Sequence, residues 1–393
     1  MNNPGLLYHK ATLYATLTHR LKPVGLRLPF FQIKTQLSKL YTSSILGNLS
    51  LTGAWVAILA SRGYSLVEIG IAETVFHITS LIFEIPSGVF ADVFGRKKML
   101  IVSTIMGIIA DVIMILSHNL FMVCMSIAFR ALSDNFSSGS GDALAYDSLK
   151  LARMEHRFAQ YESNQLILYR LCSGISTLCA GFALMIGHRI AYGTGLVTGG
   201  IQILILFSLH EVEIDTHSQN KEHRIGKKLI ECFQESFAFL KEVYPVIKFI
   251  LCNSFVGAVD ILLLFFLQAK LPEKGVSEWW LGVALLLMEV GGIVGASLIL
   301  KVPNMRYKWI FMISTMLVLI GLLAEHASLC WVMTLGGFIA AMSDDALQVR
   351  TNAILQNMFP SKQRATLTSI ESFSFSVIML VLSPLAGFVF TYC

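Results

Sequence analysis

The sequence has little charge. Charged side chains make up only 14% of its 393 residues and hydrophobic side chains 55%, whereas soluble domains carry about 25% charged residues. A soluble core cannot bury this much apolar sequence, so an ordinary cytosolic globular protein is excluded. Apolar windows of about twenty residues, long enough to cross a hydrocarbon layer of about 30 Å, recur along almost the whole chain. The composition therefore indicates a membrane protein.

The sequence also lacks the common motifs of catalysis and metal binding. The patterns H-E-x-x-H and G-x-S-x-G and a phosphate-binding loop are absent, which leaves an intramembrane enzyme without a metal or a nucleophile. The seven cysteines form no C-x-x-C pair, and most lie in apolar runs where they are expected to pack as small apolar residues. We therefore expect no enzyme activity, no metal and no cofactor.

Acidic residues are missing from the start of the chain, where none occurs before Glu68. The resulting basic tail, residues 1–39, permits two interpretations. A basic leader without acids is typical of an organellar transit peptide. The simpler interpretation, which we prefer, is a disordered cytosolic extension, since the tail has no apolar core of the secretory type.

The apolar runs predict an all-helical protein with eleven membrane spans in two groups. The spans of the first group lie near 40–60, 67–91, 99–117, 119–146, 163–186 and 189–209, and those of the second near 244–269, 279–300, 308–325, 328–356 and 364–391. We expect an N-terminal bundle over 40–209 and a C-terminal bundle over 244–393. The polar segment 210–243 is then the cytosolic linker. It is either solvated or folded into an amphipathic helix, since apolar residues recur at every fourth position from Ile225 to Phe237.

The distribution of Lys and Arg predicts the orientation of the chain. Positive residues accumulate in the short cytoplasmic loops of membrane proteins. With a cytoplasmic N-terminus, twenty-three of the 30 Lys and Arg residues fall in cytoplasmic segments and only four in outer loops. The net charge of +5 then reflects loops that face an anionic lipid surface, and it gives no reason to expect nucleic acid as a partner.

A charged turn joins the second and third predicted spans. It reads Gly88-Val89-Phe90-Ala91-Asp92-Val93-Phe94-Gly95-Arg96-Lys97-Lys98. Gly95 suits the residue of positive φ that closes a helix, and Gly88 leaves room for a neighbouring helix. Asp92 opposes the dipole at a helix C-terminus, so it needs a cation or another helix N-terminus beside it. The spacing G-x-x-x-D-x-x-G-R-K-K resembles the loop between helices two and three of the major facilitator superfamily of secondary transporters.

The resemblance includes two further segments and implies a gate on the cytoplasmic side. The run from Ser138 to Asp147 and the segment from Pro360 to Thr366 resemble bacterial efflux-type members of the superfamily, such as drug and macrolide exporters. Ser361 would cap the last span and turn its positive dipole end toward Asp92. The residues of the inner gate implied by this resemblance are Gly88, Asp92, Gly95, Arg96, Lys97 and Asp147.

Polar stripes inside the predicted spans indicate a wet path between the two bundles. A charge in hydrocarbon costs at least about 2.5 kcal/mol, so such faces should look into protein or water. Glu73, His77 and Glu84 share one face of the second span, which is either a packing seam or a cavity wall. The remaining stripes are Asn48, Thr52 and Trp55 in the first span, Arg130, Asp134, Ser137 and Gly141 in the fourth, Asn253, Gly257 and Asp260 in the seventh, and Asp345, Gln348 and Asn352 in the tenth.

Charged residues deep in the spans are candidates for proton coupling. Asp134 follows Arg130 by one helical turn and can neutralise it; alternatively Arg130 acts, as the resemblance to proton-coupled drug transporters implies, on the protonation of nearby carboxylates. Asp142 and Arg170 lie at similar depth, so we hypothesise that they pair. A buried carboxylate holds a proton more readily than an exposed one, as a proton carrier requires. The other candidates are Asp111, Asp260, Glu289 and Asp345.

Together these features predict a secondary transporter. We expect it to work as a monomer, by alternating access, in a bacterial plasma membrane with its N-terminus in the cytoplasm. Its partners are the lipid bilayer, a small amphipathic substrate that it exports, and protons that drive the export. Members of the resembled family usually have twelve helices, whereas eleven are predicted here. The alternatives are therefore a membrane receptor or scaffold that does not transport, and an inactive truncated transporter.

Overall fold

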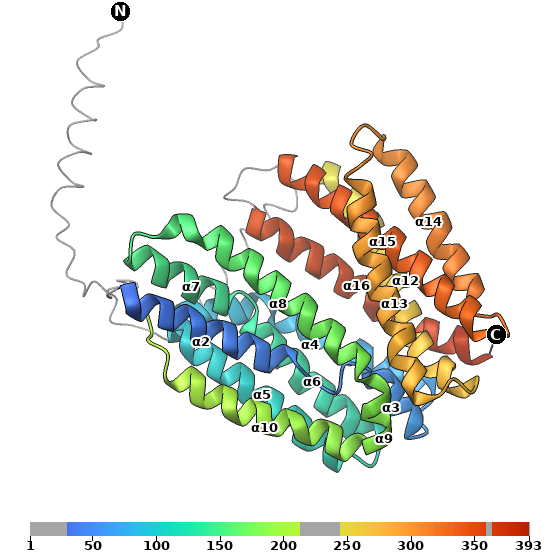
Figure 1. Ribbon diagram of the computed structural model, residues 1–393, viewed down its shortest axis with the longest axis horizontal. Helices are drawn as coiled ribbons and strands as arrows, with labels where there is room; N and C mark the ends of the chain where they lie inside the picture. The colour runs from blue at the N-terminus through green and yellow to red at the C-terminus, as the bar shows by residue number, and fades with distance from the viewer. Residues whose placement is uncertain (1–29, 213–243, 359–363, 393) are drawn as a thin grey trace, which may run out of the picture.

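The computed structural model describes residues 30–212, 244–358 and 364–392, and within these ranges every regular element is a helix (Figure 1). The predicted all-helical class is therefore confirmed. The tail before residue 30 and the segment from Ile225 to Phe237, which is either solvated or an amphipathic helix in the two interpretations above, lie outside the described residues. The same is true of Ser361, the predicted cap of the last span.

The first group of helices precedes residue 212. It comprises α2 (Phe30–Asn48), α3 (Trp55–Ser61), α4 (Leu66–Phe94), α5 (Arg96–Leu116), α6 (Leu120–Ser137), α7 (Ser140–Leu151), the short 3-10 helix η1 (Glu155–Arg157), α8 (Phe158–Leu178), α9 (Ala180–Ile186) and α10 (His188–Phe207). Helix α2 begins well before the predicted boundary at residue 40, because Ile33 and Gln36 are buried on its inner face. The Gln36 amide donates to the carbonyl of His210 and accepts from its N–H, which ties α2 to the end of α10.

The second group follows residue 243. It comprises α12 (Tyr244–Glu273), α13 (Glu278–Ile299), α14 (Tyr307–Ala324), α15 (Cys330–Met358) and α16 (Arg364–Tyr392). Helices α12, α13 and α14 all pack on α15, whereas α16 lies between the groups and packs along both α12 and α4 (Figure 1). Contacts between the groups are made mainly by α4 with α16 and by α8 and α9 with α13.

Seven of the described helices are long and apolar enough to cross a bilayer. An eighth candidate is the pair Glu155–Leu178 and Ala180–Ile186, whose axes meet at 49°. The predicted spans 40–60, 119–146 and 328–356 are not among them. The first is divided into α2 and α3, and the second into α6 and α7. The third is the continuous helix α15, but its polar stripe interrupts the apolar run. The count of eleven spans stays a prediction.

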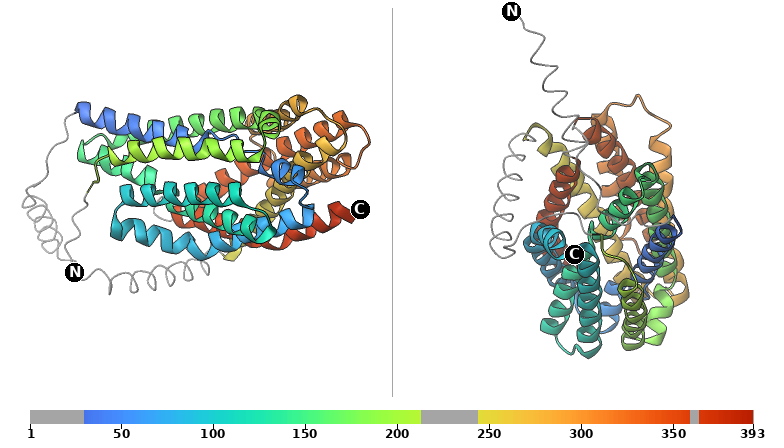
Figure 2. Two further views of the ribbon diagram at one scale, coloured as in Figure 1. Left: turned by 90° about the horizontal axis from the view of Figure 1, so that it is seen from below. Right: turned by 90° about the vertical axis from the view of Figure 1, so that its left-hand side faces the viewer.

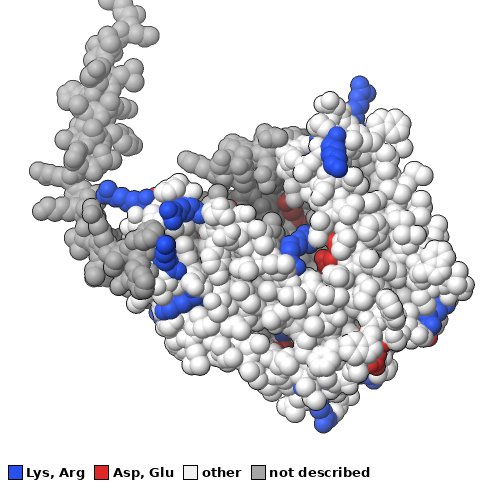
Figure 3. Space-filling view, in the orientation of Figure 1, with Lys and Arg blue, Asp and Glu red and all other residues white. Residues whose placement is uncertain are grey.

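The helices run lengthwise between two ends of the molecule (Figures 1 and 2). We call the end that holds α3, α9 and the starts of α4 and α13 the α3 end. The opposite end, which holds α7 and the start of α2, is the α7 end. Lys and Arg side chains gather over the α7 end, at the left of Figure 3, while most of the visible surface carries no charge. Such a surface suits a protein with lipid around its middle.

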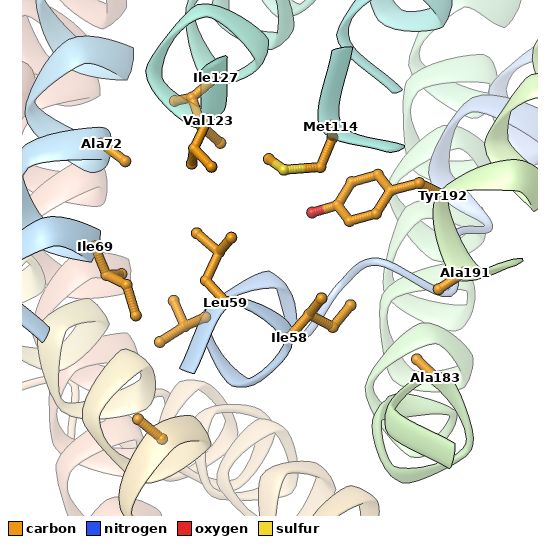
Figure 4. Close-up of a cluster of buried hydrophobic side chains, with 12 residues drawn as sticks. Ile58, Leu59, Ile69, Ala72, Met114, Val123, Ile127, Ala183, Ala191 and Tyr192 are labelled. Atoms are coloured by element: carbon orange, nitrogen blue, oxygen red, sulfur yellow. The ribbon is translucent and has the colours of Figure 1, made fainter. Parts of the chain in front are cut away.

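A buried apolar cluster closes the α3 end. Ile58 and Leu59 of α3 pack against Ile69 of α4, Met114 of α5 and Tyr192 of α10, as Figure 4 shows. The short helix α3 thus fills the space between the ends of the longer helices of the first group.

Glycines let the two groups approach closely at this end. A Cβ atom on Gly70 of α4 would overlap the backbone of Ser383 on α16, and one on Gly181 of α9 would overlap the backbone of Glu278 on α13. Small residues at helix contacts are how membrane helices pack backbone to backbone. Both contacts between the groups are therefore tight at the α3 end, and the space between them lies farther toward the α7 end.

Candidate transport site

A cavity of about 440 Å³ lies between the two groups; we call it the central cavity. The first group contributes residues of α2, α3, α4, α5, α6, α8 and α10. The second group contributes Leu264, Phe265 and Gln268 of α12 and Leu285 and Glu289 of α13. A volume in this range holds a drug-sized molecule. Because both groups form its wall, a relative movement of the groups changes the shape of the cavity.

A second cavity of about 530 Å³ lies within the first group and is called the lateral cavity. It extends toward the α7 end, where Leu40, Asp142 and Glu162 line it. The two cavities adjoin, since they share part of their lining. The shared residues are Asn48, Ser50, Asp111, Arg130, Asp134 and Tyr169.

Arg130 pairs with a carboxylate that the sequence reading did not match to it. Its Nη2 donates to Asp111 Oδ1 of α5 at 2.6 Å, and the Asp111 side chain is only 7% exposed. Of the two interpretations of Arg130, a direct pair with Asp134 is therefore wrong, because α5 packs on α6 and brings Asp111 to the same depth. Gly195 of α10 has no side chain, which leaves room for the Asp111 carboxylate.

Asp134 is left facing the cavities. Its side chain is exposed, it lines both the central and the lateral cavity, and it lies within electrostatic range of Arg130 without forming an ion pair with it. Asp134 thus lines both cavities without an ion pair to a described residue.

Arg170 links the two groups. Its Nη1 lies 3.8 Å from Glu289 Oε2, across the contact between α8 and α13 at the central cavity. The hypothesised pair of Asp142 and Arg170 is therefore wrong. The two residues do lie at similar distances from the turn between α7 and α8, but Asp142 lies within electrostatic range of Glu162, while Arg170 pairs with Glu289 of the second group.

The stripe on α4 forms a buried chain across the contact with α16. His77 Nε2 lies 3.2 Å from Glu73 Oε1, and His77 Nδ1 lies 3.2 Å from Ser376 Oγ of α16. Glu73 also lines the central cavity, whereas His77 is buried in the seam. Both interpretations of the stripe thus apply, one to each residue. Glu84, farther along α4, is half-buried and lines neither cavity.

The acids of α12 and α15 do not line either cavity. Asp260 of α12 lies within electrostatic range of Asp344 and Asp345 of α15. Gly257 of α12 leaves room for the Asp344 carboxylate, and Gly292 of α13 leaves room for that of Asp345. Gln348 Nε2 donates to Asp344 Oδ2 at 2.8 Å, whereas Asp344 Oδ1 and Asp260 Oδ1 are buried without a hydrogen-bond partner in the described part of the chain. The expectation that the stripes of α12 and α15 line the cavity is wrong, because they pack against each other.

Gln268 was missed in the sequence. It lies two turns beyond Asp260, in the apolar run L-L-L-F-F-L-Q-A-K, and reaches the central cavity from α12. Its side chain is 4% exposed, and its Oε1 has no hydrogen-bond partner within the described residues. A lone amide in an apolar span was the available signal, since a polar group in that setting needs a partner.

The charged turn lies at the α7 end. Gly95 closes α4 with φ at +101°, and Arg96 Nε lies 3.4 Å from Asp147 Oδ2 of α7. No atom of the described residues lies within 4 Å of a Cβ on Gly88, so the close helix contact expected there is not found. The side chain of Asp92 lies outside the described residues.

Glu211, a second residue missed in the sequence, caps the start of α5. Its carboxylate accepts from the backbone N–H of Arg96 at 3.0 Å and of Lys97 at 3.1 Å. The Lys97 ammonium in turn donates to the carbonyls of Phe207 and Leu209 at the end of α10. An acid at a helix N-terminus and a cation at a helix C-terminus are each favourable. The signal was an acid directly after the sixth predicted span.

Comparison with known proteins identifies the class. Residues 40–384 match the Major Facilitator Superfamily, so the chain belongs to that family. An uncharacterised transporter of the same type from Bacillus subtilis, YxaM, is 23% identical over 348 residues, which are 86% of this chain and 84% of YxaM. This chain is thus a multi-pass secondary transporter of small molecules, and not an enzyme.

Solved structures share the fold. A mutant form of the nucleoside transporter NupG superposes with a TM-score of 0.69 at 15% identity, over 90% of this chain and 91% of NupG. A D-xylose-proton symporter superposes with a TM-score of 0.64 at 11% identity, over 90% of this chain and 88% of the symporter. At these identities the likeness extends to the fold alone.

Proposed function

We propose that the protein exports a small amphipathic molecule across a bacterial plasma membrane in exchange for protons. The bundle 40–209 and the bundle 244–393 rock against each other around the central cavity, which opens in turn to each side. The observation that carries this proposal is the central cavity itself. Both groups line it, and they pack tightly against each other at the α3 end.

In this proposal the α7 end faces the cytoplasm. It carries the basic turn of Arg96, Lys97 and Lys98, and the basic residues Lys150 and Arg153 at the end of α7. The excess of positive charge in segments on this side agrees with the rule for cytoplasmic loops. The N-terminus is then cytoplasmic too. Since the α3 end is closed, the described conformation is one from which a cytoplasmic solute can be loaded for export.

Buried carboxyl groups in the second group support protons as the coupling ion. A buried ionised carboxylate without a donor is costly, whereas a protonated carboxyl group is neutral and can donate a hydrogen bond. Asp260, Asp344 and Glu325 each have a buried carboxyl oxygen without a hydrogen-bond donor among the described residues. Glu325 lies at the end of α14 and is 2% exposed. Carboxylates that lie close together in a low dielectric repel one another when all are ionised, so in this proposal Asp260 and Asp344 are the groups that take up and release protons.

The contact of Arg96 with Asp147 is proposed to act as the inner gate. It holds the start of α5 to α7 on the cytoplasmic side, within the first bundle. Closing and opening of the gate would accompany each change of side.

The test is a flux measurement on purified protein in liposomes with a pH-sensitive dye inside. A candidate amphipathic solute added on one side should move protons in the opposite direction, and an imposed proton gradient should drive accumulation of the solute. Liposomes without protein give the passive rate. A protein that binds solutes but moves neither solute nor protons would refute transport and favour a receptor or scaffold.

A further inference from the structure

The walls of the central cavity carry more negative than positive charge. Among the described residues, four carboxylates reach it, and two guanidinium groups lie among them. The acids are Glu73, Asp111, Asp134 and Glu289, and the cations are Arg130 in the wall and Arg170 beside Glu289. After the two ion pairs are formed, Glu73 and Asp134 remain, on α4 and α6 respectively.

These two acids differ in the groups that could neutralise their negative charge. Glu73 contacts His77, which is neutral unless it takes up a proton, and both are buried. Asp134 is exposed to the cavity and forms no ion pair within the described residues. A solute that approaches from the cytoplasm through the adjoining lateral cavity meets Asp134 before Glu73, since Asp134 lines both cavities and Glu73 does not line the lateral one. The lateral cavity adds Asp142 and Glu162 to this approach, so the path is acidic as well.

Aromatic rings also line the central cavity. Trp55 of α3 and Phe265 of α12 meet edge to face, with ring centroids 5.3 Å apart, so this corner is built from both bundles. Phe76, Tyr169 and Tyr192 add further rings. Aromatic faces attract cations, and carboxylates attract them more strongly. Rings together with unpaired acids are therefore typical of a site for an organic cation.

An independent observation comes from Gln268. It lies one turn beyond Phe265 on α12, is almost completely buried, and its Oε1 accepts no hydrogen bond from a described residue. A buried acceptor without a donor is costly, and Gln268 lines the central cavity, so a rotation of its amide would let a ligand supply the missing donor. A protonated amine brings both the missing donor and the missing positive charge.

We propose that the central cavity takes amphipathic organic cations, namely protonated amines with an aromatic or aliphatic body. This inference rests on the proposed function and names its substrate class. The charged head lies between Asp134 and the Gln268 amide, and the apolar body lies against the corner of Trp55 and Phe265.

The test is binding to the purified full-length protein in detergent, measured by calorimetry with four probes that share one body. They are phenylbutyltrimethylammonium, protonated phenylbutyldimethylamine, phenylbutanol and phenylbutanoate. We expect both cations to bind at least about tenfold more tightly than the neutral and the anionic probe, a difference of about 1.4 kcal/mol or more. Equal binding of all four probes, or tighter binding of the anion, would overturn the inference. This ranking needs no variant.

Two variants assign the recognition to residues. Asp134→Asn should weaken both cations by about tenfold and leave phenylbutanol unchanged. Gln268→Leu should weaken the protonated amine more than the trimethylammonium, which has no N–H to donate. The matched control is Glu155→Gln, which removes an exposed acid of η1 far from the cavity. Cation binding that is unchanged in Asp134→Asn would show that another group binds the positive charge, and it would overturn the assignment of the site to Asp134.

The flux assay separates this inference from the proposed function. Charge-selective binding without any flux would leave the cation site standing and refute transport. Proton-coupled flux of phenylbutanol or phenylbutanoate in preference to the cations would leave transport standing and refute the cation site.

Discussion

Arg170 of α8 and Glu289 of α13 form an ion pair, 3.8 Å long, that joins the two bundles at the central cavity. The side chains are 52% and 29% exposed, so water screens the attraction, and the pair is worth at most about 1 kcal/mol. Alternating access requires contacts between the bundles to break in every cycle. A weak, partly hydrated pair suits such a contact better than a buried one, which is costly to open.

Reversing one charge of this pair should therefore slow transport and leave stability almost unchanged. Arg170→Glu places two negative groups across the contact between the bundles, and Glu289→Arg added to it restores the attraction. We expect flux to fall severalfold in the single variant and to recover in the double one, with stability within about 1 kcal/mol of the wild type. A double variant no faster than Arg170→Glu would contradict the pairing.

The pair of Arg130 and Asp111 should matter for stability. Removing one partner of a buried pair costs about 3 to 5 kcal/mol. Because Arg130 is partly exposed to the cavity, we expect the free energy of unfolding to fall by about 2 to 3 kcal/mol here. Thermal unfolding of Arg130→Gln in detergent measures it. Combining it with Asp111→Asn should recover part of the loss, because no charge then stays buried alone. Independent, additive losses would argue against the contact.

Gly195 is predicted to be intolerant of a side chain. In Gly195→Ala the new methyl group meets the Asp111 carboxylate, so we expect a loss of about 1 to 3 kcal/mol. Gly193→Ala is the control in the same helix: no described atom lies within 4 Å of its Cβ, and alanine favours a helix by up to about 1 kcal/mol. Thermal unfolding of the two variants should thus shift in opposite directions. A shift in the same direction would count against the packing of α10 on α5.

Tight packing between Gly70 and Ser383 is predicted to hold the α3 end closed. Gly70→Leu should force α4 and α16 apart and admit water from that side. In a Trp55→Cys background, the thiol in the cavity should then react faster with an impermeant maleimide applied from the α3 side. Gly200→Leu, where no described atom lies within 4 Å, serves as the control. Unchanged labelling in Gly70→Leu would place the seal elsewhere.

The contact of Arg96 with Asp147 provides a test of the inner gate. Asp147→Asn should slow or abolish transport without stopping membrane insertion, since Asp147 lies outside the cavity walls, and we expect the same of Asp92→Asn. Flux and the amount of protein in the membrane are measured together. In a double-mutant cycle, Arg96→Gln should lose little further activity in the Asp147→Asn background. Full activity of the aspartate variants would exclude the gate.

The sequence indicated the candidate residues better than their partners. Asp111, Arg130, Asp134 and Glu289 were each found as charges inside apolar runs, and all four reach the central cavity. Their pairing was predicted from spacing along one helix or from depth in the membrane. Neither the spacing nor the depth tells how a helix is rotated about its own axis. This rotation decides whether Arg170 meets Asp142 or Glu289.

Glu211 and Gln268 show what spacing alone leaves out. Glu211 caps α5 although it is far from it in the sequence, and Gln268 completes a cavity wall from the second bundle. Each acts through a contact between distant segments. A sequence read for periodic stripes finds residues that repeat on one helix, and it passes over a single residue whose role comes from a neighbouring helix.

The sequence by itself determined the membrane setting, the helical class and the family. Apolar length, sparse charge and the basic turn are local properties, which the solvent acts on segment by segment. The tertiary structure alone decided which charges face one another and which stay unpaired. Helix rotation and close packing at glycines set those distances, and they pair Arg130 with Asp111 while Asp134 forms no ion pair with a described residue.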